Sequence, residues 1–330
     1  MAEVTLSKLS KSFGAVQALK DVSMTIPDGA FVVLLGPTGA GKTTTLRLIA
    51  GLDAPDSGDV RIAGQSVVRD TPAQRDVAMV FQQYSLYPHL TVRENLAFPL
   101  RSPMFAMPED EIARRVQNVA EVLRIPHKLD NKATALSGGE MQRVSIGRAL
   151  VRTPRIYLMD EPLSSLDAKL RADLRVELKR IHQDLGATFL YVTHDQIEAM
   201  TMASHVGVLD QGRLVQFGTP REIYENPVST YVASRLGQPH INLLPADAFG
   251  GAPAGATTIG LRSEHIRIGD GQEATIRRIE HLGDQTRLHL AFGPHAMVTL
   301  TEPHTQLKPG QTLKIRPHNP LWFDANGTRI

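Results

Sequence analysis

The most informative stretch of the sequence is Gly36-Pro37-Thr38-Gly39-Ala40-Gly41-Lys42-Thr43-Thr44. Its glycines, lysine and threonine have the spacing of a phosphate-binding loop. The apolar run 31–35 before it is suited to a buried parallel strand, and residues 44–50 after it read as the first turns of a helix. Strand, glycine-rich loop and helix therefore follow one another in the order that a nucleotide site requires.

The chemistry of this loop favours phosphate. Its glycines let the backbone turn several N–H groups toward one point, and the start of the helix adds partial positive charge there. We expect Lys42 to contact the outer phosphates, the Thr43 hydroxyl to bind Mg²⁺, and the whole segment 36–44 to bind the nucleotide. The alternative is a glycine-rich turn with a chance lysine, which the flanking strand and helix disfavour.

Length and composition limit the class of protein. A chain of 330 residues suits two domains, and its formal net charge of +2 gives no strong field that would argue for a nucleic-acid partner. Cysteine is absent, and the histidines show no metal-ligand spacing. The N-terminal residues do not resemble a secretory signal, and no apolar run approaches the roughly 18 residues of a membrane-spanning helix. We therefore expect any membrane role to be peripheral.

Two side chains away from the loop are candidates for nucleotide chemistry. Phe13 lies in a region of alternating apolar and polar residues typical of an antiparallel sheet, and its ring could stack on adenine. The other interpretation of Phe13 is a partly buried hydrophobe. Gln82 follows the strand-like run 77–81, where its amide could reach both Mg²⁺ and the attacking water. Without that context Gln82 would be read as a surface glutamine.

The region that follows is predicted to be largely helical. Residues 84–90 place aromatic side chains in a loop, which reads either as an edge packed under the domain or as a docking surface. The segment 109–125 is an amphipathic helix. A second helix begins near Ser137-Gly138-Gly139-Glu140, where the serine and glutamate have capping-box spacing. The two glycines also leave N–H groups open to a phosphate, so both interpretations can hold together.

Polar side chains also follow two further buried-type strands. The run 156–160 ends in Asp160, which we expect to hold Mg²⁺ through water, and the next residue, Glu161, is a candidate general base. Adjacent carboxylates are usually a solvated turn, but the apolar strand before them favours burial near a cation. The run 188–192 leads to His194, which could bond the γ-phosphate. A histidine at a strand end is otherwise more often structural.

The chain changes character near residue 237. Beyond it, glycine and proline turns separate short strands expected at 257–261, 274–280, 286–292, 296–300 and 312–316. These strands predict a small antiparallel barrel or sandwich. We therefore divide the chain into an α/β domain at 1–236, with a helical subdomain at about 84–152, and an all-β domain at 237–330.

Taken together, the motifs resemble those of the ATPase subunits of ATP-binding cassette (ABC) transporters. They are the loop 36–44, Gln82, the segment 136–140, Asp160 with Glu161, the segment 164–167, and His194. Within that family the chain looks most like the ATPase subunits of maltose, trehalose and glycerol-phosphate type sugar importers. Four stretches support this narrower resemblance: Leu86-Tyr87-Pro88-His89-Leu90-Thr91-Val92, Asp167-Ala168-Lys169-Leu170-Arg171, Gln216-Phe217-Gly218-Thr219-Pro220 and Gly260-Leu261-Arg262-Ser263-Glu264-His265-Ile266.

The resemblance implies a P-loop NTPase cassette with a mixed sheet, followed by an OB-like barrel with a regulatory role. It implies ATP and Mg²⁺ as ligands and a homodimer, in which one subunit closes over the ATP held by the other. Catalysis would fall to Glu161, His194 and Gln82, and further nucleotide contacts to Ser137, Gly138, Gly139, Glu140 and Asp167.

The resemblance also implies partners. Two membrane permease subunits would dock near the segment that runs from Tyr84 to Leu90, and a separate solute-binding protein would act through the permease. The chain would then work at the cytoplasmic face of the cell membrane. The sequence does not identify the transported solute.

Three positions depart from the usual family pattern: Glu140, where Gln is more common, Ser165, where Asn or Ala is usual, and Phe13, where Tyr or Trp is usual. None of them removes a group that the chemistry needs. One alternative function is a soluble ABC clamp acting in DNA repair or on ribosomes, which the single set of motifs and the lack of a long heptad run disfavour. Glu161 and His194 argue against a non-hydrolytic subunit, and an exporter ATPase stays open on the cassette alone.

Overall fold

The computed structural model describes residues 2–103 and 107–330. The chain folds into two compact units, the first extending to Pro220 and the second spanning Arg221–Ile330. Each unit has a hydrophobic core of its own.

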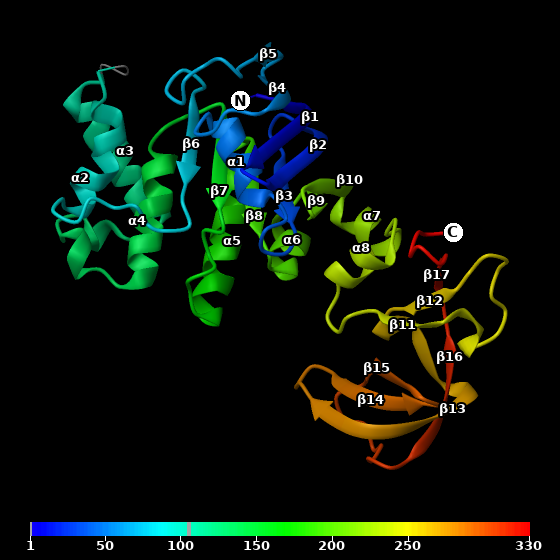
Figure 1. Cartoon of the computed structure of the whole chain (residues 1–330). Helices are drawn as coiled ribbons and strands as arrows, with labels where there is room; N and C mark the ends of the chain where they lie inside the picture. The colour runs from blue at the N-terminus through cyan, green and yellow to red at the C-terminus, as the bar shows by residue number, and fades with distance from the viewer. Residues whose placement is uncertain (1, 104–106) are drawn as a thin grey trace. The chain divides into compact units, whose positions relative to one another are not determined.

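The first unit is built on a six-stranded sheet with the order β10-β9-β3-β8-β7-β6 (Figure 1). All neighbours pair in parallel except β10, which pairs antiparallel with β9. Every residue of the three central strands is buried, as expected for strands covered on both faces. The strands are β3 Phe31–Leu35, β6 Val77–Val80, β7 Ile156–Asp160, β8 Phe189–Thr193, β9 His205–Asp210 and β10 Arg213–Gly218.

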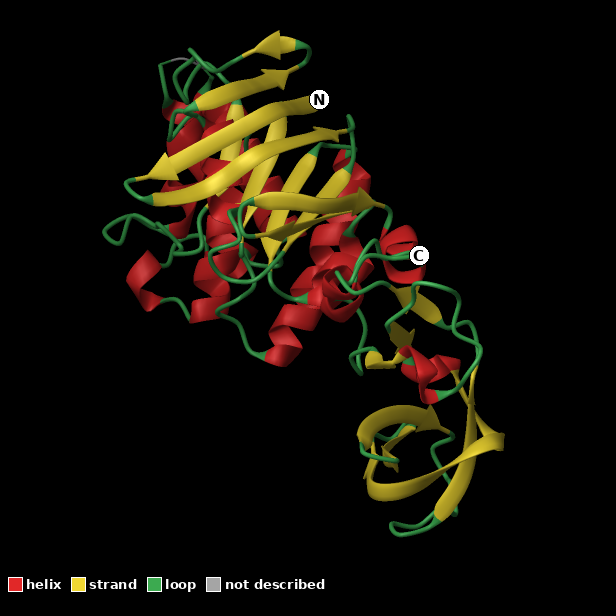
Figure 2. Ribbon diagram, turned by 45° about the vertical axis from the view of Figure 1, so that its right-hand side comes forward, coloured by secondary structure: helices red, strands yellow, loops and turns green. Residues whose placement is uncertain are grey.

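A second, antiparallel sheet crosses over the first (Figure 2). It has the order β2-β1-β4-β5, with β1 Val4–Phe13, β2 Val16–Ile26, β4 Ser57–Ile62 and β5 Gln65–Ser66. Its buried residues, such as Leu6 and Val22, share one core with Leu46 and Ile49 of helix α1. This sheet and the six-stranded sheet therefore share one core with α1 and with Ala40 of the phosphate loop.

Helices complete the first unit. Helix α1 (Lys42–Ala50) packs on β7 and β8, helix α6 (Gln196–Met202) packs on β3, and α5 (Ala168–Leu185) contacts α6. Helices α2 (Val92–Ala97), α3 (Glu109–Val122) and α4 (Gly138–Leu150) gather on one side of the unit (Figure 1). Short 3₁₀ turns lie between them at Phe98–Arg101, Pro126–Lys128 and Ala133–Ala135. The helical subdomain at about 84–152 stays a prediction.

The second unit contains two short helices and two antiparallel sheets, ordered β11-β12-β17 and β15-β14-β13-β16. The expected strand at 286–292 is confirmed, whereas β13 is longer than predicted and β11 and β17 were not predicted. The elements are α7 Pro220–Glu225, α8 Thr230–Arg235, β11 Asn242–Pro245, β12 Thr258–Leu261, β13 Ile266–His281, β14 Thr286–Phe292, β15 His295–Thr301, β16 Thr312–Pro317 and β17 Leu321–Phe323, with 3₁₀ turns at Ala246–Ala248 and Ser263–His265.

Helices α7 and α8 group with the second unit, although the sequence placed them in the first. Arg262 ties both helices to this unit: it is 1% exposed and donates hydrogen bonds to the carbonyl oxygens of Tyr224 (3.1 Å), Ala233 (2.9 Å) and Leu236. Its guanidinium also lies 4.0 Å from the centre of the Tyr224 ring. The domain limit at 236 remains a prediction, and the compact units divide at Pro220 instead.

Candidate functional site

The phosphate loop joins β3 to α1, and two of its glycines adopt a backbone conformation that other residues avoid. Gly39 and Gly41 have φ angles of 82° and 101°. Gly41 is also tightly enclosed, because a Cβ atom there would lie 2.5 Å from the Leu19 side chain and 2.7 Å from the Ala18 carbonyl oxygen. The glycine spacing read from the sequence therefore has a steric cause.

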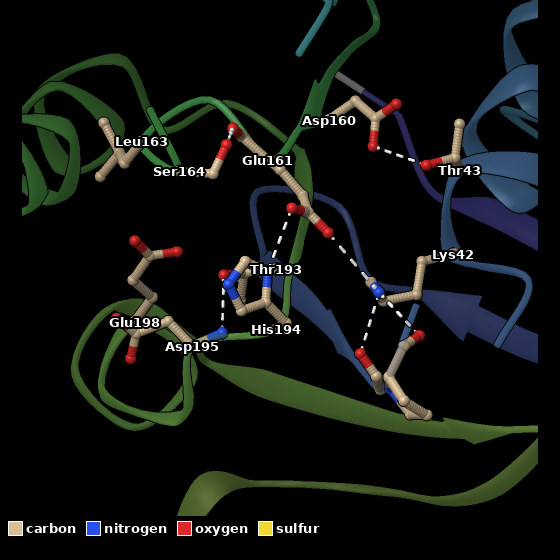
Figure 3. A network of polar contacts seen from close by, with 12 residues as sticks. Lys42, Thr43, Asp160, Glu161, Leu163, Ser164, Thr193, His194, Asp195 and Glu198 are labelled. Carbon is tan, nitrogen blue, oxygen red and sulfur yellow. Dashed lines mark hydrogen bonds and ion pairs between the residues drawn. The ribbon is translucent and has the colours of Figure 1, made fainter. Parts of the chain in front are cut away.

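Lys42 is buried at the first position of α1 and points back into the loop. Its Nζ donates to the carbonyl oxygens of Gly36 (2.9 Å) and Pro37 (3.0 Å), and it lies 3.6 Å from Oε1 of Glu161 (Figure 3). Burial lowers the pKa of the Lys42 ammonium, and the negative charge of Glu161 opposes that shift. The loop thus encloses a cation held by hydrogen bonds to its own backbone.

Thr43 and Asp160 meet beside this lysine, although they lie far apart in the sequence. The Thr43 hydroxyl donates to Oδ1 of Asp160 over 2.9 Å, at the end of β7. Burial raises the pKa of the Asp160 carboxyl above its ordinary value, so a cation there would stabilise its charged form. A hydroxyl and a carboxylate are oxygen donors of the kind that Mg²⁺ prefers.

These two residues do not form a complete metal site. Within residues 2–103 and 107–330, no group of three or more His, Asp or Glu side chains could hold a metal ion. Mg²⁺ commonly binds through one or two protein ligands together with substrate phosphates and water, so the Thr43 and Asp160 pair fits that mode.

Glu161 and His194 form the next contact of the site (Figure 3). Nδ1 of His194 lies 3.1 Å from Oε2 of Glu161, while Oε1 of the same carboxylate faces Lys42. The Glu161 backbone has a φ of 44°, in the left-handed region, and its carbonyl oxygen accepts hydrogen bonds from the Ser164 hydroxyl (2.9 Å) and amide (3.2 Å). The predicted base and the predicted histidine are therefore adjacent.

A cavity of about 580 Å³ lies at this loop, within the size range of small-molecule sites. Four of the predicted site residues line it together: Lys42, Thr43, Gln82 and Glu161. Several other lining residues were not predicted, because they belong to β2 or to a turn that carries no motif of its own. The residues that line the cavity are Val16, Gln17, Ala18, Lys20, Thr38, Gly39, Gly41, Lys42, Thr43, Thr44, Gln82, Glu161 and Gln211.

Phe13 does not line this cavity. It ends β1 with 48% of its surface exposed, and the Lys11 ammonium lies 5.3 Å from the centre of its ring. The ring is therefore about half exposed and carries a cation over it, and its stacking on adenine stays a prediction.

Residues 137–140 and Asp167 also lie outside the cavity of their own chain. Ser137 and Glu140 form the predicted capping box of α4: the Glu140 carboxylate accepts from the Ser137 amide (2.8 Å) and lies 3.0 Å from the Lys128 ammonium. These contacts hold the pKa of Glu140 below its ordinary value. Asp167 caps α5 through the Leu170 amide (3.0 Å). The Glu140 carboxylate is thus engaged by the helix start and by Lys128 of the same chain.

The segment 84–90 borders a smaller groove of about 260 Å³. Arg148 lies within it, with its guanidinium 4.7 Å from the centre of the Tyr87 ring, and burial lowers the pKa of this arginine. The Tyr84 hydroxyl is 3.2 Å from the Ser165 hydroxyl. The groove is lined by Ala78, Met79, Phe81, Tyr84, Ser85, Tyr87, Phe98, Pro99, Ser145, Arg148, Ala149 and Arg152.

Comparisons with known proteins agree with this geometry. Residues 19–164 match the ABC transporter family, and residues 259–322 match the TOBE domain. The sn-glycerol-3-phosphate import ATP-binding protein UgpC of Ruegeria sp. (strain TM1040) is 44% identical over 351 residues, which cover 100% of this chain and 99% of that protein. UgpC of Brucella abortus biovar 1 is 47% identical over 310 residues, or 88% of each chain.

Solved structures resemble about two thirds of this chain. The dimeric structure of MJ0796, a bacterial ABC transporter cassette, has a TM-score of 0.60 and 32% identity, covering 66% of this chain and 99% of that chain. A post-hydrolysis state of the same cassette, bound to ADP and Pi, has a TM-score of 0.59 and 33% identity, and covers the same shares of the two chains.

Loop, carboxylates and comparisons together define a P-loop ATPase of the ATP-binding cassette type, with a TOBE domain after it. More particularly, the chain belongs to the ABC transporter family as an ATP-binding subunit of the kind found in importers. The predicted fold class and family are confirmed, and a soluble clamp and an exporter are not favoured. In the described part of the chain no helix is both long and apolar enough to cross a membrane.

Proposed function

We propose that this chain hydrolyses ATP to drive the uptake of a carbohydrate or a related solute, such as a glycerol phosphate, through partner membrane subunits. The observation that carries the proposal is two sets of contacts side by side: Thr43 binds Asp160, and the next residue, Glu161, contacts both Lys42 and His194. The names of the relatives supply the direction of transport and the kind of solute.

Lys42 has the binding role. Its ammonium already lies inside the loop, so it can exchange the carbonyl oxygens of Gly36 and Pro37 for phosphate oxygens without first leaving water. The loop N–H groups and the start of α1 add further donors for phosphate.

Glu161 has the catalytic role. As general base it accepts the proton of the attacking water, which requires the carboxylate form. Lys42, 3.6 Å from one carboxylate oxygen, and His194, 3.1 Å from the other, fix the direction of the carboxylate. Gln82 lines the same cavity and can orient the water through its amide.

Mg²⁺ would be held by the Thr43 hydroxyl, Asp160 and Gln82, and when bound it neutralises charge on the phosphates. Before it binds, Thr43 and Asp160 hold each other in place through their hydrogen bond. The raised pKa of Asp160 indicates that its negative charge is poorly stabilised until a cation arrives.

The remaining predicted residues are assigned to a second copy of the chain. Ser137, Gly138, Gly139, Glu140 and Asp167 do not line their own cavity, and the MJ0796 cassette has a dimeric structure. We therefore propose that they complete the partner's site in a homodimer. Permease subunits would dock on the groove beside the segment 84–90, at the cytoplasmic face of the membrane, and a separate solute-binding protein would act through them.

The test of this function compares Glu161→Gln with the native chain. The variant should bind ATP within about twofold of the native affinity, while its turnover falls by about 100-fold or more, because a neutral amide cannot accept the proton. Glu302→Gln, an exposed change in the second unit, serves as the control and should keep native turnover.

The outcomes of this test separate the claims. Native turnover in Glu161→Gln would remove Glu161 from the role of base. A chain that does not hydrolyse ATP after co-purification with its permease partners would overturn the function itself. In the same preparation, the solute that stimulates hydrolysis identifies the substrate.

A further inference from the structure

Arg171, near the start of α5, holds three backbone carbonyls of the loop that follows Glu161. Its Nε donates to the Leu163 oxygen over 3.2 Å, and its Nη2 donates to the oxygens of Leu166 (2.8 Å) and Ser164 (3.4 Å). A planar guanidinium can serve several acceptors at once because its N–H groups form a fixed fork. One side chain therefore fixes the path of the loop 163–166.

Arg171 also reaches the loop that carries His194. Its Nη1 lies 3.8 Å from Oδ2 of Asp195, the residue directly after the histidine. Asp195 is itself held in place, since its Oδ1 accepts from the Ile197 amide (2.7 Å) and its own amide donates to the Thr193 hydroxyl (3.0 Å). The arginine thus ties the loop 163–166 to the segment 193–197.

These two segments meet a second time at the site itself. His194 contacts the Glu161 carboxylate at 3.1 Å, and the Ser164 hydroxyl donates to the Glu161 carbonyl oxygen at 2.9 Å. Figure 3 shows Ser164, His194 and Asp195 on the two segments beside Glu161. The contacts form a closed ring, so displacement of Arg171 changes the placement of Glu161 and His194 together.

We propose that Arg171 is a positioning residue of the ATPase, which holds Glu161 and His194 in register by tying the loop 163–166 to Asp195. The proposal rests on the proposed role of Glu161 as general base. Arg171 does not line the nucleotide cavity, so it affects turnover and leaves nucleotide binding unchanged. Lysine cannot replace it, because a single ammonium does not reproduce the fan of contacts to three carbonyls.

The first test measures turnover and nucleotide affinity of the full chain. Arg171→Lys should lower kcat by about tenfold, with KM for MgATP and the nucleotide Kd within about twofold, since small displacements of catalytic groups are costly. Asp195→Asn keeps the cap on α6 and should lower kcat by about threefold. If both act through one ring, the double variant is no slower than Arg171→Lys alone. Lys169→Gln, an exposed change on the same turn, is the control and should keep native turnover.

The second test needs no turnover. The Ser164 amide donates to the Glu161 carbonyl (3.2 Å) and the Leu166 amide to the Leu163 carbonyl (3.3 Å), so hydrogen exchange at these amides reports opening of the loop 163–166. In Arg171→Lys we expect exchange at 163–166 to be about fivefold faster, with a melting temperature within about 2 °C of the native chain.

Native kcat in Arg171→Lys, an equal loss of nucleotide affinity, additive losses in the double variant, or unchanged exchange at 163–166 would each overturn the proposal. Failure of the proposed function looks different, because the native chain itself would then hydrolyse no ATP. In that case the exchange measurement still decides whether Arg171 holds the loop.

Discussion

The carbonyl oxygens of Gly36 and Pro37 compete with phosphate for the Lys42 ammonium. The ammonium already donates to Gly36 and Pro37, and a phosphate must displace both contacts. Because the charge is desolvated there, its attraction for a phosphate is stronger than that of a lysine in water.

Removal of this side chain therefore tests the core of the site. We expect Lys42→Ala to weaken nucleotide binding by about 100-fold or more, because it deletes the buried cation of the loop. Lys20→Ala is the comparison, since Lys20 lines the same cavity and is expected to lose only about threefold. Fluorescence titration with a labelled nucleotide measures both. Equal losses in the two variants would contradict the special role of Lys42.

A buried acid in α6, the helix that follows His194, predicts that the stability of the fold depends on pH. Glu198 is 3% exposed and accepts a hydrogen bond from the Tyr191 hydroxyl at 2.9 Å; burial raises its pKa above the ordinary 4.5, although hydrogen bonds from Thr193 and Tyr191 oppose the shift. Just above pH 4.5 the folded chain therefore binds more protons than the unfolded chain, and the free energy of unfolding falls as the pH rises.

Glu198→Gln removes this titration. Its melting temperature relative to the native chain should therefore increase as the pH is raised from about 4 to about 7. Thermal melts of both chains at several pH values provide the measurement. An advantage that stays constant or shrinks toward neutral pH would contradict the raised pKa.

The site residues could be predicted from the sequence where the chemistry requires a fixed spacing between them. The glycines with Lys42 and Thr43 form one local pattern, and Asp160 and His194 stand at strand ends that the parallel sheet brings to one edge. The ring through Arg171 and Asp195 was not predictable, because it depends on where side chains point between distant segments.

At the scale of the element, the start of α4 explains the unusual glutamate at position 140. Its carboxylate closes the capping box with Ser137 and pairs with Lys128, so its charge is used inside one chain. Glutamine at this position can keep the cap, because its amide oxygen also accepts hydrogen bonds.

We therefore expect Glu140→Gln to cost less than about 1 kcal/mol of stability, the value of one partly exposed ion pair. Turnover should stay within about twofold of native, since Ser137 and Lys128 of the same chain already engage the carboxylate and leave little of its charge for a nucleotide in the partner's site. Urea unfolding and ATP hydrolysis measure the two effects. A large gain in activity would instead show that the charge of Glu140 acts on a nucleotide.

Elements were predictable where a pattern repeats over several residues. The strand β14 alternates buried and half-buried residues along its length, and the prediction matched it. Strands β11 and β17 span only four and three residues, too few for a repeating pattern to stand out in the sequence, and both are held by pairing with β12.

At the scale of the whole molecule, Arg262 organises the second unit. Arg262 directly follows strand β12. Its hydrogen bonds join the end of that strand to α7 and to α8 with its C-cap, all within residues 221–330. Sequence alone could not place the division at Pro220, since the pairing of one arginine with three distant carbonyls leaves no local pattern.

Arg262→Ala should destabilise the second unit by about 3 kcal/mol or more, because it leaves buried carbonyl oxygens without donors. Hydrogen exchange should become faster within residues 221–330, while ATP hydrolysis by the first unit stays within about twofold. The control is Arg267→Ala, an exposed arginine of the same unit. Faster exchange throughout the first unit would contradict a local role.

The left-handed backbone of Glu161, with its φ of 44°, creates a trade-off between thermal stability and turnover at this position. Asparagine and glycine adopt that conformation more comfortably than glutamate, which carries strain of order 1 kcal/mol there. Heat resistance alone would therefore favour a shorter side chain at this position. A chain that keeps glutamate retains a carboxylate for the attacking water and accepts a strained backbone in return. Position 161 is therefore the first residue to change in a heat-resistant, inactive form of this cassette.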